Sequence, residues 1–372
     1  MAMQTEWLVP LAQPRQKKQR CELCLGPATV RCAACLVTYY CDVDHQNADW
    51  ISVHAKICRL LIPLRAAPPF YTSEKERKLG EEQKRNREIF LAEVTFETAQ
   101  NFLLEGHHED AIPAALHSLK FSISIYGPDS AELVPAYLAL AETSLGLGHL
   151  SQGEEYLSQA QWIVLKNPHC SYNIQSKLHR NLGLLYAARG NFDDSLYHLA
   201  NDVYFACCAF GTTSNVAISG GYFHMANIFS RQNKMDIVDS LYAEVVNLWH
   251  DHFSHFVGIQ YQKLITPAEV DLLSVEDGKE EDVLDEKQRA EATEMLNSIL
   301  HFREQSLRPQ PEKKAKLLHA LAMFHFLIHD LAQADEFVMR FLQTVKALPT
   351  RDPGESLYHL VKLIKSREEQ RK

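Results

Sequence analysis

Apolar residues from about residue 89 onward recur at helical spacing, in paired stretches separated by a turn residue. The clearest copy, residues 178–200, reads LHRNLGLLYAARGNFDDSLYHLA. Its first half places Leu182 and Leu185 on one helical face, and its second half does the same with Leu196 and Leu199. The glycine between the halves accommodates the left-handed conformation that often ends a helix. The pattern predicts a helical hairpin.

Five segments share this skeleton. A small residue is followed seven positions later by a turn residue, and five positions after that by a second residue that is small in four of the five. The turn residues of the first four segments lie 42, 42 and 43 positions apart, and the fifth lies 96 beyond the fourth. Because two helices cross closely only where side chains are small, the skeleton predicts a repeated hairpin. The sets are Ala99, Gly106 and Ala111; Ala141, Gly148 and Gly153; Gly183, Gly190 and Ser195; Ala226, Asn233 and Val238; and Ala322, His329 and Ala334.

The repeats predict a mainly α fold and a division of the chain into separate helical parts. An acidic loop at 274–287 contains seven carboxylates, which would either bind a basic partner or simply stay solvated. The expected parts are a linker and charged helix at 59–88, four hairpins at 89–253, a degenerate hairpin with the acidic loop at 254–307, a fifth hairpin at 308–348 and a capping helix at 349–372.

The skeleton resembles the tetratricopeptide repeat, whose signature has small residues at these two helix positions. The period near 42 exceeds the usual length of about 34 and is similar to the long-helix form of kinesin light chains. This resemblance implies a right-handed α-solenoid with an extended surface for protein partners.

Cysteine and histidine gather in one stretch ahead of the repeats, from Cys21 to Cys58. The spacing is C-x2-C, seven residues, C-x2-C, five residues, C-x3-H, eight residues, H-x3-C, and it contains six of the nine cysteines. When two residues separate a pair of cysteines, one turn of the chain can direct both thiols to the same ion, so these pairs predict zinc sites. The alternative is a disulfide framework. It fits poorly because no export signal opens the sequence and the other three cysteines follow no pairing scheme.

The stretch resembles the MYND finger, including Tyr40 before the third pair and the Gln46–Trp50 spacing. In that family the first and third ligand pairs share one ion, and the second and fourth share the other. Four protein donors close a structural site and leave no position for a reactive water. His45 departs from the family, which usually has Cys there. The resemblance implies two structural Zn²⁺ ions, one bound by Cys21, Cys24, Cys41 and His45 and the other by Cys32, Cys35, His54 and Cys58.

The resemblance also implies a peptide site. In MYND fingers a Gln and a Trp four positions apart line a shallow groove for proline-rich peptides, which would assign this role to Gln46 and Trp50. An exposed indole packs well on the proline rings of an extended peptide. The alternative is that Trp50 only covers the zinc core.

Composition narrows the classes of partner. The formal net charge is −9, which argues against a nucleic-acid partner because such proteins need a basic face. No apolar run approaches the ~20 residues of a membrane span, so no membrane partner is expected. Residues 1–20 are expected to form a disordered arm that ends in a basic cluster. Free cysteines indicate a reducing, cytoplasmic compartment.

Two function classes remain, an adaptor without enzymatic activity and a lysine methyltransferase. SET-and-MYND methyltransferases also join a MYND finger to helical repeats, but they split a SET domain around the finger. The 20 residues before Cys21 are too few for the first half, and the region after Cys58 lacks that family's Asn-His cofactor motif. Nucleophile elbows, phosphate loops and dinucleotide fingerprints are also absent from the sequence. We therefore expect no enzyme.

The domain order and the phrases VTYYCDVDHQNADW and HRNLGLLYAARGNFDDSLYHLANDVYFA resemble MYND-finger proteins of motile cilia that also contain tetratricopeptide repeats. This resemblance implies an axoneme-associated adaptor of motile cilia and sperm flagella. Its expected partners are another tetratricopeptide-repeat protein and components linked to dynein arms.

Overall fold

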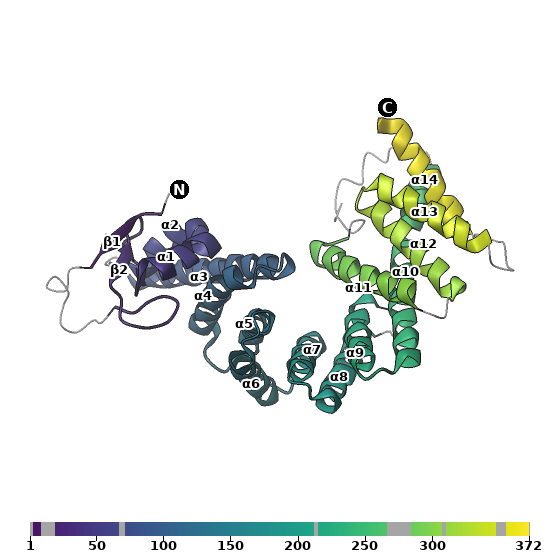
Figure 1. Cartoon of the computed structure of the whole chain (residues 1–372). Coiled ribbons are helices and arrows are strands. Elements are labelled where there is room, and N and C mark those ends of the chain that lie inside the picture. The colour runs from purple at the N-terminus through teal and green to yellow at the C-terminus, as the bar shows by residue number, and fades with distance from the viewer. Residues whose placement is uncertain are drawn as a thin grey trace. The chain divides into compact units, whose positions relative to one another are not determined.

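The computed structural model describes residues 3–8, 19–66, 71–211, 215–265, 284–306, 310–346 and 355–371 (Figure 1). Within these ranges the fold is mainly α, as the periodicity predicts. Most of the predicted acidic loop at 274–287 lies outside the described residues. No helix in the described ranges is both long enough and apolar enough to cross a membrane.

The finger combines a small sheet with a helical run. Strands β1 (Thr5–Trp7), β2 (Val30–Cys32) and β3 (Tyr39–Tyr40) form an antiparallel sheet in the order β1-β2-β3. Asp42 then starts the run, because its side chain accepts a hydrogen bond from the His45 amide at 2.7 Å. The run consists of α1 (Val43–Asp49), a π-helical turn (Trp50–His54) and α2 (Ala55–Arg65).

Ten of the helices in the described ranges pair as five hairpins (Figure 1). The remaining long helices are α11 (Glu286–Gln305) and α14 (Glu355–Arg371). The pairs are α3 (Glu74–Leu104) with α4 (His108–Tyr126), α5 (Val134–Gly146) with α6 (Leu150–Lys166), α7 (Tyr172–Ala188) with α8 (Phe192–Phe210), α9 (Ser219–Arg231) with α10 (Met235–Ile265), and α12 (Pro311–Leu327) with α13 (Leu331–Lys346).

Every hairpin turns at the residue that the skeleton predicts. The five turn residues have φ between +60° and +78°, including the two that are not glycine, Asn233 and His329. Each turn has the same two hydrogen bonds. At Gly148, for example, the turn amide donates to Leu145 O at 3.0 Å and the next amide donates to Ser144 O at 2.8 Å. This pattern is the Schellman motif, which satisfies the last carbonyl groups of the first helix.

The predicted small residues lie where the paired helices cross. All ten are buried, including the larger Val238. At the third crossing the Ser195 hydroxyl donates a hydrogen bond to Gly183 O at 2.6 Å, which shows how closely the two backbones approach. The helical pairing that the sequence skeleton predicts is therefore present in the structure.

Two expected boundaries fall inside continuous helices. The predicted division at residues 88 and 89 lies within α3, which begins at its Ser73 cap and runs for 31 residues. The predicted division after residue 253 lies within α10. The physical reason in α10 is that Trp249, Phe253 and Val257, four positions apart, continue one buried face through the expected break.

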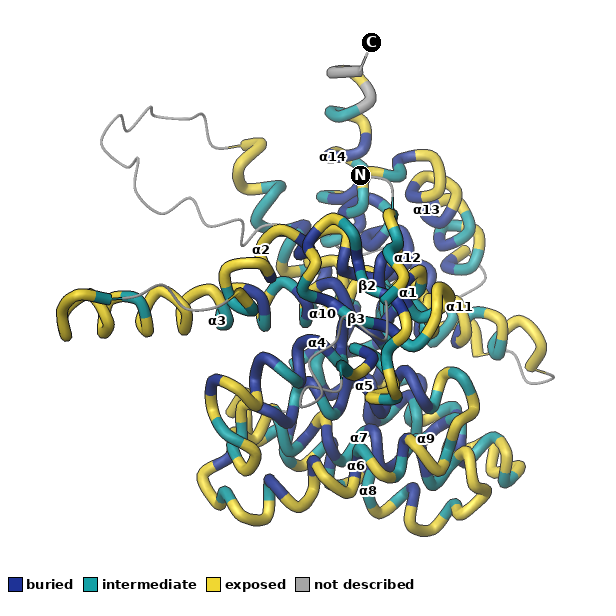
Figure 2. The backbone as a smooth tube through the Cα atoms, turned by 90° about the vertical axis from the view of Figure 1, so that its left-hand side faces the viewer, coloured by how far each residue is buried: buried dark blue, intermediate teal, exposed yellow. Residues whose placement is uncertain are grey.

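The chain divides into two compact units, Met1–His198 and Leu199–Lys372, with the boundary inside α8. The core of the first unit contains Leu133, Leu140 and Leu157. The core of the second is built around Trp249 and Phe324. The N-terminal part of α3 is exposed on all sides (Figure 2), so only its C-terminal part contributes to the first core.

Candidate metal centres and their support

The first group of candidate ligands is Cys21, Cys24, Cys41 and His45, whose donor atoms all lie within 4.8 Å of one another. Cys21 Sγ lies 3.6 Å from His45 Nδ1, and Cys24 Sγ lies 3.6 Å from Cys41 Sγ. Cys41 directly follows β3, and His45 lies in the first turn of α1. The cap at the start of α1 therefore sets the position of the ligand histidine.

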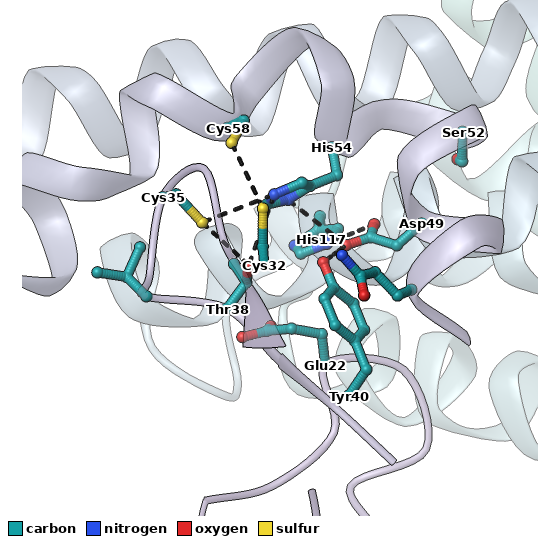
Figure 3. A network of polar contacts seen from close by, with 12 residues as sticks. Glu22, Cys32, Cys35, Thr38, Tyr40, Asp49, Ser52, His54, Cys58 and His117 are labelled. Atoms are coloured by element: carbon teal, nitrogen blue, oxygen red, sulfur yellow. Dashed lines mark hydrogen bonds and ion pairs between the residues drawn. The ribbon is translucent and has the colours of Figure 1, made fainter. Parts of the chain in front are cut away.

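The second group is Cys32, Cys35, His54 and Cys58, and all four are buried. Cys35 Sγ lies 3.7 Å from His54 Nε2, and Cys32 Sγ lies 3.9 Å from Cys58 Sγ. Figure 3 shows the four side chains converging from β2, the following turn, the π-helical turn and α2. The two groups are the interleaved sets that the family resemblance implies.

Both C-x2-C pairs adopt the same turn. The residue after each pair is a leucine with positive φ, 60° at Leu25 and 61° at Leu36. The Leu25 amide donates to Cys21 O at 3.1 Å, and the Leu36 amide donates to Cys32 O at 2.9 Å. A leucine in this region is strained, so the surrounding structure must impose the conformation. The shared turn directs both thiols of a pair toward one point.

The donor geometry fits tetrahedral zinc. Four donors about 2.3 Å from one ion lie about 3.7 Å apart, which is close to the four separations given above. The separation of Cys41 Sγ from His45 Nδ1 is shorter, 2.8 Å. All nine cysteines are free thiols in the structure, which does not support the disulfide alternative.

The electrostatics of the second group also favour a cation. A hydrogen bond between the thiols of Cys32 and Cys35 lowers the pKa of Cys35 to about 3 and raises the pKa of Cys32. Burial, with the charge of Cys35, raises the pKa of Cys58 to about 11. The three thiols therefore do not all ionise by themselves near neutral pH. A divalent cation removes this conflict, because it stabilises every thiolate that it contacts.

A buried polar network joins the second group to the first hairpin (Figure 3). Asp49 Oδ1 accepts a hydrogen bond from His117 Nε2 on α4 at 2.9 Å, and Asp49 Oδ2 accepts one from the Tyr40 hydroxyl at 2.6 Å. Asp49 Oδ2 also lies 3.6 Å from Nδ1 of the candidate ligand His54. A carboxylate on the far side of a ligand imidazole fixes the orientation of the ring.

The charge of Asp49 depends on these neighbours. Burial alone would raise the pKa of the carboxyl, but the charge and hydrogen bond of His117, together with His54 and Tyr40, outweigh it and lower the pKa of Asp49 to about 2. The carboxylate is therefore ionised inside the interface between the finger and α4.

Further contacts fix the finger to α4. Ser52 Oγ accepts a hydrogen bond from the Ala114 amide at 3.1 Å. Glu22, between the first two cysteines, pairs with Arg65 Nη1 at 2.5 Å and with Lys120 Nζ at 3.1 Å. Because Lys120 lies on α4, this ion-pair group ties the N-terminal part of the finger to the hairpin. The finger is thus packed against the first hairpin as part of the same unit.

The predicted peptide groove at Gln46 and Trp50 is closed in the structure. The Gln46 side chain is fully buried, and Trp50 is 9% exposed, with its ring 5.7 Å from that of His54. Gln46 Nε2 donates to Gln4 O at 3.0 Å, and Met3 packs against the core that contains Trp50. The expectation of an exposed groove is therefore wrong for this conformation. The reason is that residues of the expected disordered arm form β1 on the edge of β2.

The supporting residues His117, Glu22 and Lys120 were not found from sequence because their spacing follows no ligand pattern. One weak signal exists for His117. It stands on the same helical face as Ala114 and Phe121, three and four positions away, and all three side chains are buried. A polar residue inside an apolar stripe indicates a buried hydrogen-bond partner, but it does not identify that partner.

Residues 21–58 match the family described as MYND finger. The matched range begins and ends at the first and last candidate ligands. This part of the chain is a MYND zinc finger, and a helical, repeat-like body follows it.

Proposed function

We propose that this chain is a non-enzymatic adaptor, in which two zinc ions hold a finger that caps a helical body for binding protein partners. The observation that carries the proposal is the number of donors at each centre. Each group supplies four protein donors, which is the full set of a structural zinc site, whereas catalytic sites keep one position open. Bound zinc would cross-link the loops and helices of the finger and neutralise its thiolates.

The packing of the finger supports the same function. Asp49, Ser52 and Glu22 all contact α4, so the finger covers one end of the repeated hairpins. Terminal units of repeat proteins must protect the apolar core from water, and the finger does this for the first hairpin. The finger is therefore a structural cap as well as a candidate binding module.

The helical body offers apolar side chains to a partner. Trp162 and Leu165 on α6 are 56% and 71% exposed and lie three positions apart on one helical face. Tryptophan is common among the residues that dominate protein interfaces. We assign this surface to partner binding, in motile cilia and sperm flagella, with another tetratricopeptide-repeat protein and axonemal dynein-associated components as partners.

Affinity capture from sperm or ciliated-cell extract tests the proposal. We expect the intact chain to recover dynein-associated axonemal components and a second repeat protein. The double variant Trp162→Ser and Leu165→Ser should lose part of this set, because both side chains are exposed and their replacement leaves the core intact. A matched double variant at exposed polar positions of the same helix, Gln159→Ser and Gln161→Ser, should retain the whole set.

The result that would contradict the adaptor function is an intact chain that recovers no partner from these extracts. Isothermal calorimetry with S-adenosylmethionine addresses the methyltransferase alternative. We expect no heat of binding, and saturable binding of this cofactor would overturn the non-enzymatic assignment.

A further inference from the structure

The two groups of candidate zinc ligands differ in how far solvent reaches their thiols. All four ligands of the second group are buried, whereas Cys21 is the only buried ligand of the first group. Cys24 is exposed, and Cys41 is partly exposed. Solvent therefore reaches two thiols of the first group and is kept away from the thiols of the second.

The turn that positions Cys24 leaves one side of its thiol uncovered. Gly26 follows two positions later, and a Cβ added to it would lie 3.3 Å from Cys24 Sγ. Because glycine has no side chain, this space stays open. The intervening Leu25 is 56% exposed, so the whole turn lies at the surface.

A second thiol lies beside the exposed one. Cys24 Sγ is 3.6 Å from Cys41 Sγ. A disulfide bond is about 2.05 Å long, so the two sulfur atoms need to approach each other by only about 1.5 Å to form one. The second group contains a comparable pair, Cys32 and Cys58, with sulfur atoms 3.9 Å apart, but this pair is buried. Exposure, and not separation, therefore distinguishes the two pairs.

These two features are the ones that make a cysteine sensitive to oxidation. Coordination to a divalent cation keeps a cysteine as its thiolate, which is the nucleophilic form. Cysteines that act as redox sensors are accessible to solvent and often lie next to a second thiol that completes a disulfide. Cys24 meets both conditions, whereas the thiols of the second group lack access.

We propose that Cys24 and Cys41 form a site of oxidative modification, at which a peroxide joins the two thiols in a disulfide and the first group releases its ion. The second group keeps its ion, because its thiols are buried. This inference rests on the zinc sites of the adaptor proposed above.

The oxidation proceeds in two steps with hydrogen peroxide as the oxidant. The Cys24 thiolate attacks one peroxide oxygen, so that an S–O bond forms, the O–O bond breaks and hydroxide leaves, which gives a sulfenic acid. The Cys41 thiolate then attacks the Cys24 sulfur, an S–S bond forms, and the sulfenic oxygen leaves as a second hydroxide. The two thiolates together lose two electrons to the peroxide. A disulfide offers no thiolate to a metal, so the first group loses two of its four donors.

The structural change should stay local to the first group. Asp49 and Ser52, which contact α4, lie in the same helical run as His54 of the second group. This part of the finger keeps its ion. We therefore expect faster hydrogen exchange in the turn that contains Cys24 after oxidation, and unchanged exchange in α4.

The test exposes the full-length, zinc-loaded chain to hydrogen peroxide and follows zinc release with a coloured chelator. We expect one of the two zinc ions to be released, while the other stays bound until the chain is denatured. Alkylation of the remaining thiols and mass spectrometry of tryptic peptides should find a Cys24–Cys41 disulfide. A dithiol reductant with added zinc should restore the original metal content.

A conservative variant separates the role of the exposed thiol from the loss of a ligand. Cys24→His keeps a zinc donor at this position but removes the oxidisable group, so it should retain both ions in peroxide. The matched control is Cys208→Ser, which removes an exposed thiol outside both groups and should release one ion as the parent chain does.

Three results would overturn the inference. They are release of both ions at the same rate, a zinc-loaded Cys24→His chain that loses an ion to peroxide as fast as the parent, and a disulfide that joins any other pair of cysteines. Selective release from a chain that captures no partner would refute the adaptor function alone. An untreated chain without zinc would refute both proposals.

Discussion

Among individual residues, His319 of α12 shows how strongly burial controls charge in the second unit. Its side chain is 6% exposed, and its Nδ1 lies 3.1 Å from His250 Nε2 on α10. Burial, together with the charge of His250, lowers the pKa of His319 to about 3. Burial also lowers the pKa of His250. Both imidazoles are therefore neutral in the folded protein at neutral pH.

We expect the second unit to lose stability on acidification. In the unfolded chain a histidine has a pKa of about 6.5. Between pH 6.5 and 3 the unfolded chain therefore binds a proton at His319, whereas the folded chain does not. The contribution of neutral His319 to the free energy of unfolding is complete above pH 6.5. Below pH 6.5 this free energy falls by about 1.4 kcal/mol for each pH unit. Urea unfolding of the chain at pH 7.5 and 5.5 measures this loss.

His319→Gln removes the titrating group and should reduce the difference between the two pH values. His255→Gln is the matched control, because His255 is exposed on the adjacent helix. Equal pH dependence of these two variants would refute the assignment to His319.

At the scale of elements, the hairpin turns decide where each helix ends. Gly106, Gly148 and Gly190 have φ of +76° to +78°, and open space surrounds the position of an added Cβ at each. A side chain at these positions would be strained by the backbone alone, and no neighbouring atom would clash with it. Asn233 fills the equivalent position in the fourth hairpin with φ of +60°, which asparagine tolerates better than other residues with a Cβ.

Gly148→Ala should destabilise the first unit by about 1–2 kcal/mol, since alanine has no special tolerance of the left-handed region. Gly148→Asn should cost less, because the fourth hairpin already uses asparagine at this position. Denaturant unfolding followed by circular dichroism measures both changes. Equal losses for Ala and Asn would show that the turn conformation is not the cause.

Inside a helix, replacing glycine by alanine is expected to stabilise the protein, which is the opposite of its effect at a hairpin turn. Gly258 lies within α10, and an added Cβ there meets no other atom within 4 Å. Gly258→Ala should therefore stabilise the second unit by about 0.5–1 kcal/mol, because alanine loses less backbone freedom on folding. A destabilised Gly258→Ala protein would mean that this part of α10 is not a regular helix.

At the scale of the whole molecule, metal binding and helical packing are connected in the first unit. A stretch of fewer than forty residues buries too little apolar surface to fold by itself, so we expect the finger to need bound zinc. The same stretch contacts α4 through Asp49 and Ser52. Among the described residues, no group of candidate metal ligands lies in the second unit, whose core is built around Trp249 and Phe324.

We expect loss of metal to loosen the first hairpin and to leave the core of the second unit unchanged. Cys58→Ser removes a buried candidate ligand, whereas Cys208→Ser changes an exposed cysteine outside both groups. Elemental analysis should find two zinc ions per chain in Cys208→Ser and fewer in Cys58→Ser. Hydrogen exchange should become faster in α3 and α4 of Cys58→Ser only.

Unchanged exchange in α4 of the Cys58→Ser protein would show that the first hairpin does not need the finger. A full complement of two zinc ions in that variant would remove Cys58 from the ligand set.

The sequence by itself determined the features that rest on local spacing. The C-x2-C pairs indicated two metal-binding turns because such a turn involves only a few consecutive residues, whereas the assignment of the remaining donors to each group came from the family resemblance. The small residues and turn positions specified all five hairpins, from Gly106 to His329, because each hairpin is a local structure with a fixed helical period. The mainly α fold followed from the same periodicity.

Only the tertiary structure decided what lies beside these local units. The contacts of His117 with Asp49 and of Lys120 with Glu22 join residues 68 and 98 positions apart, and no sequence period connects them. The closed groove at Gln46 is another such case, because a strand of only three residues, Thr5–Trp7, gives no signal in the sequence that it will pair with β2. Local geometry is encoded over a few residues, whereas burial depends on which distant surfaces meet.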